Sequence, residues 1–253
     1  MRIDINADVG ESFGVYVLGH DASLMRSITS ASVAAGFHAG DPSVLRRTIR
    51  LAKSHGVKIG AHPGFPDLVG FGRRDLQVTP AEAEDLVLYQ IAAVAGVAAA
   101  EGVKLQHVKP HGALFNMAAR NAGLAAAIAR AVAAFDASLM LFGLPGSEIL
   151  NAGRAAGLRV AAEVFADRAY EPDGSLTPRT KGGSVIHEGA AVVSRAVRMI
   201  RDRTVVAIDG TAVALEADTI CVHGDTPGAG DLAAELHAGL ESAGVTVRAI
   251  GLP

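Results

Sequence analysis

Four short polar motifs in this chain could carry chemistry, and each contains a histidine next to small residues. They are GFHAGD (36–41), GAHPG (60–64), VKPHGA (108–113) and VHGDTPG (222–228). A fifth motif, DINADVGE (4–11), has carboxylates in the equivalent place. Each motif follows an apolar, β-branched run, so we expect strands whose carboxyl ends converge on one site. Histidines, carboxylates and a lysine gathered in this way indicate an enzyme that uses general acid–base catalysis.

The N-terminal motif places polar side chains on one face of a strand. Asp4, Asn6 and Asp8 alternate with apolar residues and therefore point the same way. Polar groups inside a packed core are costly unless they bond to one another or to a ligand. A structural network is one interpretation of Asp4 and Asn6. We expect Asp8, at the end of the strand beside Gly10, to be catalytic, with Glu11 on the following loop.

The histidines divide into two groups. His38, His62, His111 and His223 fall at or just past predicted strand ends, beside small residues that leave room for a ligand. A single histidine in such a place is usually structural, but four in equivalent positions indicate a shared site. The others are expected to lie on the surface or to pack: His20, His55, His107, His187 and His237.

A metal site is an open alternative. The H-x₃-H spacing of His107 and His111 is weak support for one, because Pro110 opposes a helix and a strand would separate the two residues by ~13 Å. Asp8, His38 and His62 could instead form a divalent-metal site across neighbouring strands, since histidine and carboxylate ligands suit zinc and similar ions.

The cationic side chains suggest anion stabilisation. Lys109 lies at a strand end and could stabilise an oxyanion or hold a phosphate or carboxylate. Arg73, in the loop GFGRRD, could contact a carboxylate through two hydrogen bonds. We expect the catalytic residues to be Asp8, Glu11, His38, Lys109 and His111. We expect the substrate-binding residues to be Asn6, Asp41, His62, Arg73, His223 and Asp225.

Several familiar motifs are missing from the sequence. It has no G-x₄-G-K-[ST] phosphate loop and no G-x-G-x-x-G after the first strand. It also lacks G-x-S-x-G, and Cys221 has no nucleophile context. Hydrolysis by an activated water molecule remains as the expected chemistry.

Strand-length apolar runs alternate with helical segments, which predicts α/β architecture with right-handed βαβ units and a parallel sheet. An irregular barrel of about seven main strands fits best, and an open doubly wound sheet is the alternative. We expect a hairpin at 204–217, a further strand at 245–251, and one domain over 1–253. The predicted strands are 2–7, 32–37, 57–62, 105–108, 138–143, 158–165 and 218–223. The predicted helices are 42–55, 80–101, 112–134, 146–156, 187–202 and 228–243.

Charge, cysteine content and hydropathy limit the expected cellular location of the protein and the partners it could bind. A net charge of −3 over 253 residues offers no basic surface for nucleic acid. A single cysteine suits a reducing compartment, and the first residues are strand-like rather than a leader. The longest apolar stretch, 86–100, is too short to span a bilayer. We therefore expect a cytoplasmic protein without a membrane partner.

The motifs, in this order, resemble the LamB/YcsF family, the A subunits of prokaryotic ATP-dependent 5-oxoprolinase. The similar stretches cover nearly the whole chain. One departure is visible, because the family usually has a cysteine where this chain has Ala35, so that thiol is not needed for chemistry. The stretches are DINADVGESFG (4–14), AAGFHAGDP (34–42), GAHPGFPDLVGFGRR (60–74), VKPHGALFN (108–116), EVFADRAY (163–170), GSLTPR (174–179) and VHGD (222–225).

The resemblance implies a barrel of the glycoside hydrolase/deacetylase type. It also implies hydrolysis of the lactam of 5-oxo-L-proline to L-glutamate, with ATP as a co-substrate of a complex that contains the 5-oxoprolinase subunits B and C. Two other functions stay open: a metal-dependent deacetylase on the same barrel, and a non-catalytic subunit that presents substrate. Homo-oligomerisation is also left open.

Overall fold

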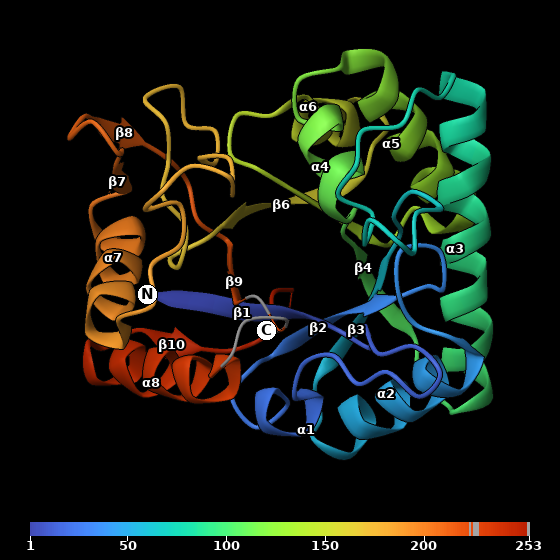
Figure 1. Cartoon of the computed structure of the whole chain (residues 1–253), viewed down its shortest axis with the longest axis horizontal. Helices are drawn as coiled ribbons and strands as arrows, with labels where there is room; N and C mark the ends of the chain where they lie inside the picture. The colour runs from blue at the N-terminus through green and yellow to red at the C-terminus, as the bar shows by residue number, and fades with distance from the viewer. Residues whose placement is uncertain (223, 225–227, 252–253) are drawn as a thin grey trace.

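Seven parallel strands close into a barrel in the part of the chain that this computed structural model describes, residues 1–222, 224 and 228–251. Strand β9 pairs with both β6 and β1, which closes the ring in the order β1-β2-β3-β4-β5-β6-β9 (Figure 1). The barrel strands are β1 (Arg2–Val9), β2 (Ser30–Ala34), β3 (Lys58–His62), β4 (Leu105–Val108), β5 (Met140–Gly143), β6 (Arg159–Val164) and β9 (Thr219–Val222). The predicted irregular barrel is therefore confirmed, and the open sheet is wrong.

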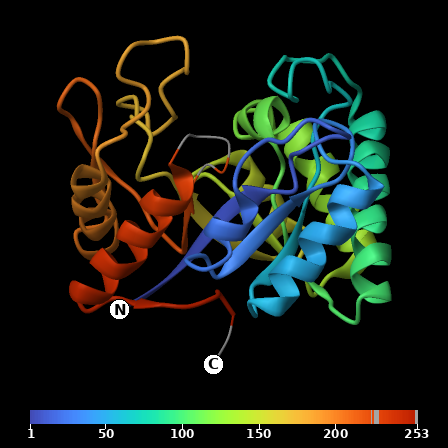
Figure 2. The same cartoon turned by 60° about the horizontal axis from the view of Figure 1, so that its bottom comes forward.

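Helices cover the outside of the barrel. The loops that follow the barrel strands gather at one end, and the N-terminus lies at the other (Figure 2). The helices are α1 (Asp21–Leu24), α2 (Pro42–Ser54), α3 (Pro80–Ala100), α4 (Gly112–Ala118), α5 (Ala122–Asp136), α6 (Glu148–Ala155), α7 (Gly189–Arg201) and α8 (Ala229–Ser242).

Three smaller strands lie outside the ring. The predicted hairpin is present as β7 (Thr204–Val206) and β8 (Ala212–Ala214), which pair antiparallel. The tail strand is shorter than expected: β10 (Thr246–Val247) pairs in parallel with the start of β1.

Local sequence signals set several helix boundaries. Thr79 and Glu82 form a reciprocal capping box at the start of α3, as the Thr-Pro-x-Glu pattern predicts. The predicted single helix at 112–134 is wrong, since it divides into α4 and α5. Asn121 interrupts it, because its side chain accepts a hydrogen bond from the Leu124 amide and starts a new helix.

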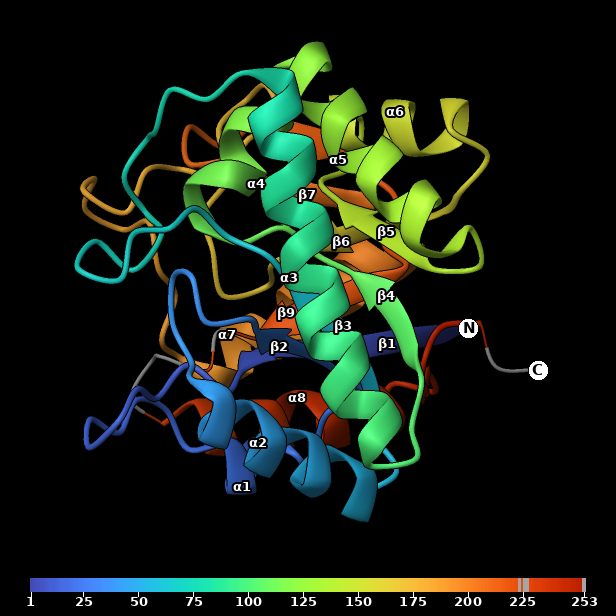
Figure 3. The same ribbon diagram turned by 90° about the vertical axis from the view of Figure 1, so that its right-hand side faces the viewer.

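Helix α3 is long and apolar enough, by length and composition alone, to cross a membrane. The whole helix has 21 residues, so it exceeds the apolar stretch considered in the sequence. Its buried face, with Val87, Ile91 and Val94, packs into the hydrophobic core, and the helix runs along the barrel beside α5 (Figure 3). It is therefore a wall helix of the barrel.

Strand β1 has apolar side chains on one face and polar side chains on the other. Ile3, Ile5, Ala7 and Val9 belong to the hydrophobic core. The alternate residues face the barrel interior, where polar side chains of other strands meet them. Asp4, for example, accepts hydrogen bonds from hydroxyls on β2 and β9. The expected one-sided placement of the polar residues of β1 is thus confirmed.

The buried side chain of His107 makes the free energy of unfolding depend on pH. Its ring is buried, stacks on Phe142 and bonds to Ser32 and Gln106. Burial lowers its pKa to about 3 from an ordinary value near 6.5. As the pH falls, the unfolded chain therefore takes up the proton before the folded chain does. The stabilising contribution of neutral His107 to the free energy of unfolding is complete above pH 6.5 and is lost as the pH falls towards 3. By pH 5 the loss is about 2 kcal/mol.

Urea unfolding of the wild type and of His107→Gln between about pH 5 and pH 7.5 tests this. The wild type should lose more stability on acidification than the variant, because other buried histidines titrate in both proteins. Equal pH slopes would contradict a neutral His107.

Candidate active site

The candidate residues converge at the carboxyl ends of four neighbouring strands. His62 is the last residue of β3, and His38 follows β2. Lys109 and His111 follow β4, and Glu11 follows β1. All five are buried, and their positions at or after the carboxyl ends of barrel strands place them at one end of the barrel.

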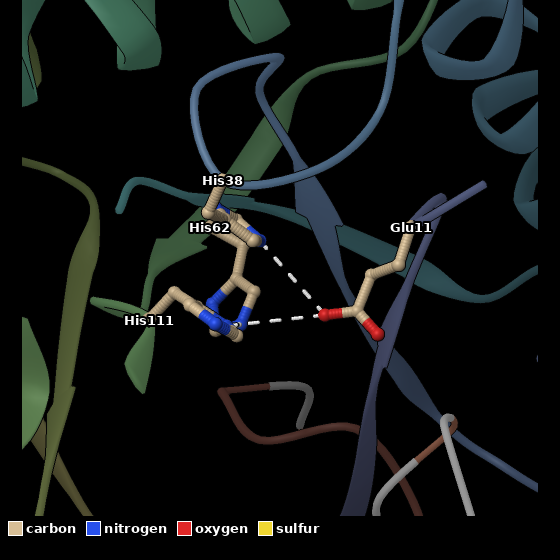
Figure 4. A group of neighbouring side chains, drawn as sticks. All are labelled: Glu11, His38, His62 and His111. Atoms are coloured by element: carbon tan, nitrogen blue, oxygen red, sulfur yellow. Dashed lines mark hydrogen bonds and ion pairs between the residues drawn. The ribbon is translucent and has the colours of Figure 1, made fainter. Parts of the chain in front are cut away.

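Three histidine rings form a compact cluster (Figure 4). His38 stacks on His111 with ring centroids 3.8 Å apart, and His62 meets both rings edge-on. Burial lowers the pKa of His38 and of His111 well below the ordinary histidine range, so both rings are neutral near pH 7.

Two glycines allow the loop after β3 to cover this cluster. A Cβ atom on Gly64 would lie 2.6 Å from Nδ1 of His38. A Cβ on Gly72 would lie 2.7 Å from Cβ of His38 and 2.8 Å from Cδ2 of His111, and its φ of +63° already favours glycine. The small residues of this loop therefore serve the close approach of backbone to the rings.

The backbone partners assign the tautomers of two rings. Nδ1 of His62 lies 2.7 Å from the Lys109 carbonyl, and Nε2 of His111 lies 2.8 Å from the Phe71 carbonyl. Carbonyl oxygens only accept, so both nitrogens carry hydrogen. In the neutral rings, Nε2 of His62 and Nδ1 of His111 then face each other with lone pairs, at 3.0 Å. Two facing lone pairs call for a proton or a cation between them.

Two carboxylates lie beside the ring nitrogens that carry lone pairs. Oε1 of Glu11 lies 3.8 Å from Nε2 of His38 and 3.9 Å from Nδ1 of His111, and Figure 4 shows the carboxylate directed at both rings. Oδ1 of Asp8 lies 3.3 Å from Nε2 of His62. One ligand atom from each of Glu11, His38, His62 and His111 falls within 4.8 Å of the others. Three imidazoles and a carboxylate are a donor set that zinc and similar ions accept.

Behind Asp8, the Lys109 ammonium is enclosed by acceptors. Its Nζ lies 2.8 Å from Oδ1 of Asp8 and 2.8 Å from Oε1 of Glu163. Cys221 Sγ at 3.1 Å and Asn6 Oδ1 at 3.3 Å complete the surroundings. Burial opposes the charge, yet the neighbouring carboxylates hold the pKa of Lys109 well above its usual range. Lys109 is a buried cation whose three N–H groups are directed at protein atoms.

The profile of the LamB/YcsF family matches residues 3–252. The chain belongs to the LamB/YcsF family. The resemblance inferred from the motifs is therefore confirmed over nearly the whole length.

Relatives of this LamB/YcsF chain are similar over their full length. A protein from Tolumonas auensis, named as the A subunit of 5-oxoprolinase, is 53% identical, covering 98% of this chain and 99% of the relative. A protein of the same name from Symbiobacterium thermophilum is 55% identical, covering 99% of this chain and 96% of the relative. The crystal structure of a lactam utilization protein from Thermus thermophilus superposes with a TM-score of 0.94 at 49% identity, covering 99% and 100% of the two chains.

A more distant likeness concerns the fold alone. A family 4 carbohydrate esterase from Streptomyces lividans has a TM-score of 0.54 at 12% identity, covering 99% of this chain and 93% of that one. The predicted deacetylase-like barrel is thereby confirmed.

Other predicted residues of the LamB/YcsF chain lie away from the cluster. The carboxylate of Asp41 caps α2 through the amides of Ser43 and Val44, and it also accepts from the Gly14 amide. Arg73 is exposed at the rim, with its guanidinium 4.8 Å from the centre of the Phe71 ring. His223 and Asp225 lie outside the described residues.

Asn6 belongs to the buried network behind Asp8 rather than to the histidine cluster. Its side-chain amide donates to Glu163 at 2.9 Å and to Thr219 at 2.8 Å. The prediction of a metal site on Asp8, His38 and His62 also differs from the observed donor set, in which Glu11 and His111 join the two histidines and Asp8 lies beside them.

Glu163 is a further functional candidate, which the sequence motifs did not single out. It is a lone carboxylate within the apolar strand segment LRVAAEVF, and the argument applied to the polar residues of β1 would have singled it out. The carbonyl of Phe71 was also missed, because a backbone group leaves no mark in the sequence.

Proposed function

We propose that this chain is the A subunit of an ATP-dependent 5-oxoprolinase, a hydrolase that opens the lactam of 5-oxo-L-proline to give L-glutamate. The observation that carries the proposal is the Asp8 carboxylate, which pairs with a buried ammonium at 2.8 Å and lies 3.3 Å from a histidine nitrogen at the mouth of the barrel. The names of the full-length relatives and of the Thermus lactam utilization protein support the substrate.

The step that uses ATP and the hydrolysis of the lactam are assigned to different subunits of the complex. A lactam carbonyl is a poor electrophile, and phosphorylation of its oxygen would make the ring carbon open to attack by water. Because the sequence contains no phosphate loop, we assign that phosphorylation to the B and C subunits and the hydrolysis to this chain. The complex is then expected in the cytoplasm.

In this proposal Asp8 takes a proton from the attacking water, and Glu11 or His38 assists it. The ring C–N bond then breaks and the nitrogen takes up a proton, which leaves the new carboxyl group as an acyl phosphate. A second water molecule cleaves this acyl phosphate to L-glutamate and inorganic phosphate.

The Nε2–H of His111 is donated to the Phe71 carbonyl, so His111 would stabilise charge on the ring oxygen only through a proton held at Nδ1. At the rim, Arg73 is placed to bind the substrate carboxylate. Lys109 acts on Asp8 rather than on the substrate, because its Nζ is surrounded by acceptors of the protein itself.

A divalent metal is compatible with the cluster. Glu11, His38, His62 and His111 would hold it, and the facing lone pairs of two of these rings favour a cation there. Such an ion supplies Lewis-acid polarisation of an oxygen atom. The neutral state of His38 and His111 is the one that binds metals.

Metal binding is tested without any assay of activity. Zinc titrated into the metal-free protein should bind at one ion per chain and raise the unfolding temperature, because the ion binds only the folded state. His38→Ala should reduce both effects, whereas His237→Ala, a histidine on α8, should leave them intact. Equal binding by all three proteins would rule out this cluster as the metal site.

The function itself is tested by reconstitution. Glutamate release from 5-oxoproline is measured with this chain, with candidate B and C subunits, and with all of them together, each with ATP. We expect release only from the full set. Isotope tracing then follows the phosphoryl group: its transfer to oxoproline by this chain alone would contradict the assignment of steps.

The histidine–carboxylate cluster also suits a metal-dependent deacetylase acting on a small or carbohydrate amide. Acetate release from N-acetylated sugars by the isolated, zinc-loaded chain, together with loss of that activity on chelation, would favour this alternative over the oxoprolinase.

A further inference from the structure

Glu163 has an unusual environment for a buried carboxylate. It lies on β6 in the barrel interior and is fully buried. Its Oε1 accepts from Nζ of Lys109 at 2.8 Å and from Nδ2 of Asn6 at 2.9 Å. Its Oε2 is buried and has no hydrogen-bond partner among the described residues. Oε1 of this carboxylate therefore has hydrogen-bond partners, and the buried Oε2 has none among the described residues.

Stability alone does not account for this arrangement. Asp8 and Glu163 share one ammonium, so the buried group carries more carboxylates than cations. A buried charge is costly unless it is paired and its remaining lone pairs are hydrogen-bonded. An amide at this position would avoid the charge and still accept from Lys109 and Asn6. Unsatisfied buried groups in native proteins often mark a functional requirement.

The geometry points to what that requirement is. Lys109 follows β4, and the two carboxylates that contact its Nζ come from β1 and β6. Glu163 thus takes one N–H of the ammonium while Asp8 takes another. Asn6, two residues before Asp8 on the same face of β1, is bound to Glu163 as well. Glu163 is thus linked to Asp8 through the shared ammonium, and the two carboxylates also repel each other.

We propose that Glu163 is a positioning residue for the hydrolysis. It holds the Lys109 ammonium between two carboxylates, so that Asp8 is oriented but not fully neutralised by its cation. Without the negative charge of Glu163, the ammonium moves towards Asp8 and draws that carboxylate away from the attacking water. The inference rests on the proposed function, since it concerns the Asp8 of that mechanism.

The test is Glu163→Gln in the reconstituted complex with candidate B and C subunits. The variant keeps the shape and the Oε1 acceptor, and it removes only the charge. We expect kcat for glutamate release to fall about 10- to 100-fold, because misplacement of a reacting group is costly, with KM changed less than about threefold. The unfolding temperature should stay the same or rise, since a partly unsatisfied buried charge is removed.

Asp4→Asn is the matched control. Asp4 is a buried carboxylate of the same interior and accepts from the hydroxyls of Thr29, Ser30 and Thr219. It is linked to the Lys109 contacts only indirectly among the described residues, through Thr219 and Asn6. Its replacement should lower the unfolding temperature while kcat stays within about twofold, because the reacting groups keep their positions.

The outcomes distinguish failure of the positioning role from failure of the proposed function. If the wild-type complex releases glutamate and Glu163→Gln matches it in kcat, the positioning role is refuted. If Glu163→Gln instead loses stability and activity together, Glu163 is a structural ion-pair partner and the proposal is also refuted. If the wild-type complex releases no glutamate, the proposed function fails and this inference fails with it.

Discussion

Asp8→Asn should reduce glutamate release by the reconstituted complex by about 10² to 10⁴-fold. The substitution preserves the shape and an acceptor for Lys109, but it removes the carboxylate that lies 2.8 Å from Nζ and 3.3 Å from Nε2 of His62. An amide cannot take a proton from water. The loss should appear in kcat, measured at saturating oxoproline and ATP.

Asp4→Asn is the control for that experiment, because it makes the same change on the same face of the same strand, four residues earlier. It should retain turnover. Circular dichroism and the unfolding temperature should show that Asp8→Asn is folded. Near-normal turnover by folded Asp8→Asn would remove Asp8 from the mechanism.

Lys109→Met should lower the free energy of unfolding by about 3–5 kcal/mol. Methionine fills a similar volume, but two carboxylates then remain in the barrel interior without their cation. The cost arises from these uncompensated charges rather than from lost packing. Urea unfolding near neutral pH measures it.

A combined variant distinguishes this cause from a cavity. Adding Asp8→Asn and Glu163→Gln to Lys109→Met removes both stranded charges, so most of the lost stability should return. If the triple variant is as unstable as Lys109→Met alone, packing explains the loss. If Lys109→Met is as stable as the wild type, the ammonium does not balance these carboxylates.

Much of the architecture followed from local patterns. Apolar runs alternating with helical segments predicted the seven barrel strands, and the predicted helices 42–55 and 80–101 begin where α2 and α3 begin. The errors lay where local signals compete. Residues 119–121 continue an alanine-rich helical pattern, yet the helix divides there because Asn121 caps a new one. Helix α1 was missed because it is only four residues long.

The site was only partly readable in advance. Alternation along β1 and the histidines at strand ends identified several residues that meet, such as Glu11, His38, His62 and His111, but not Glu163. It did not identify which side chain contacts which. Lys109 was expected to face a substrate oxygen, whereas the structure directs it at Asp8 and Glu163. That choice depends on β6, which comes two strands later in the chain than β4.

Local sequence patterns predicted the barrel, the end of it at which the ionisable side chains gather, and the types of side chain found there. Periodicity and strand-end position are local properties, so they can be read from neighbouring residues. Only the tertiary structure decided the grouping: Glu11 with the three histidine rings, and Asp8 with Lys109 and Glu163. Those contacts depend on strand order and register, which bring residues distant in the chain close enough to form hydrogen bonds and ion pairs.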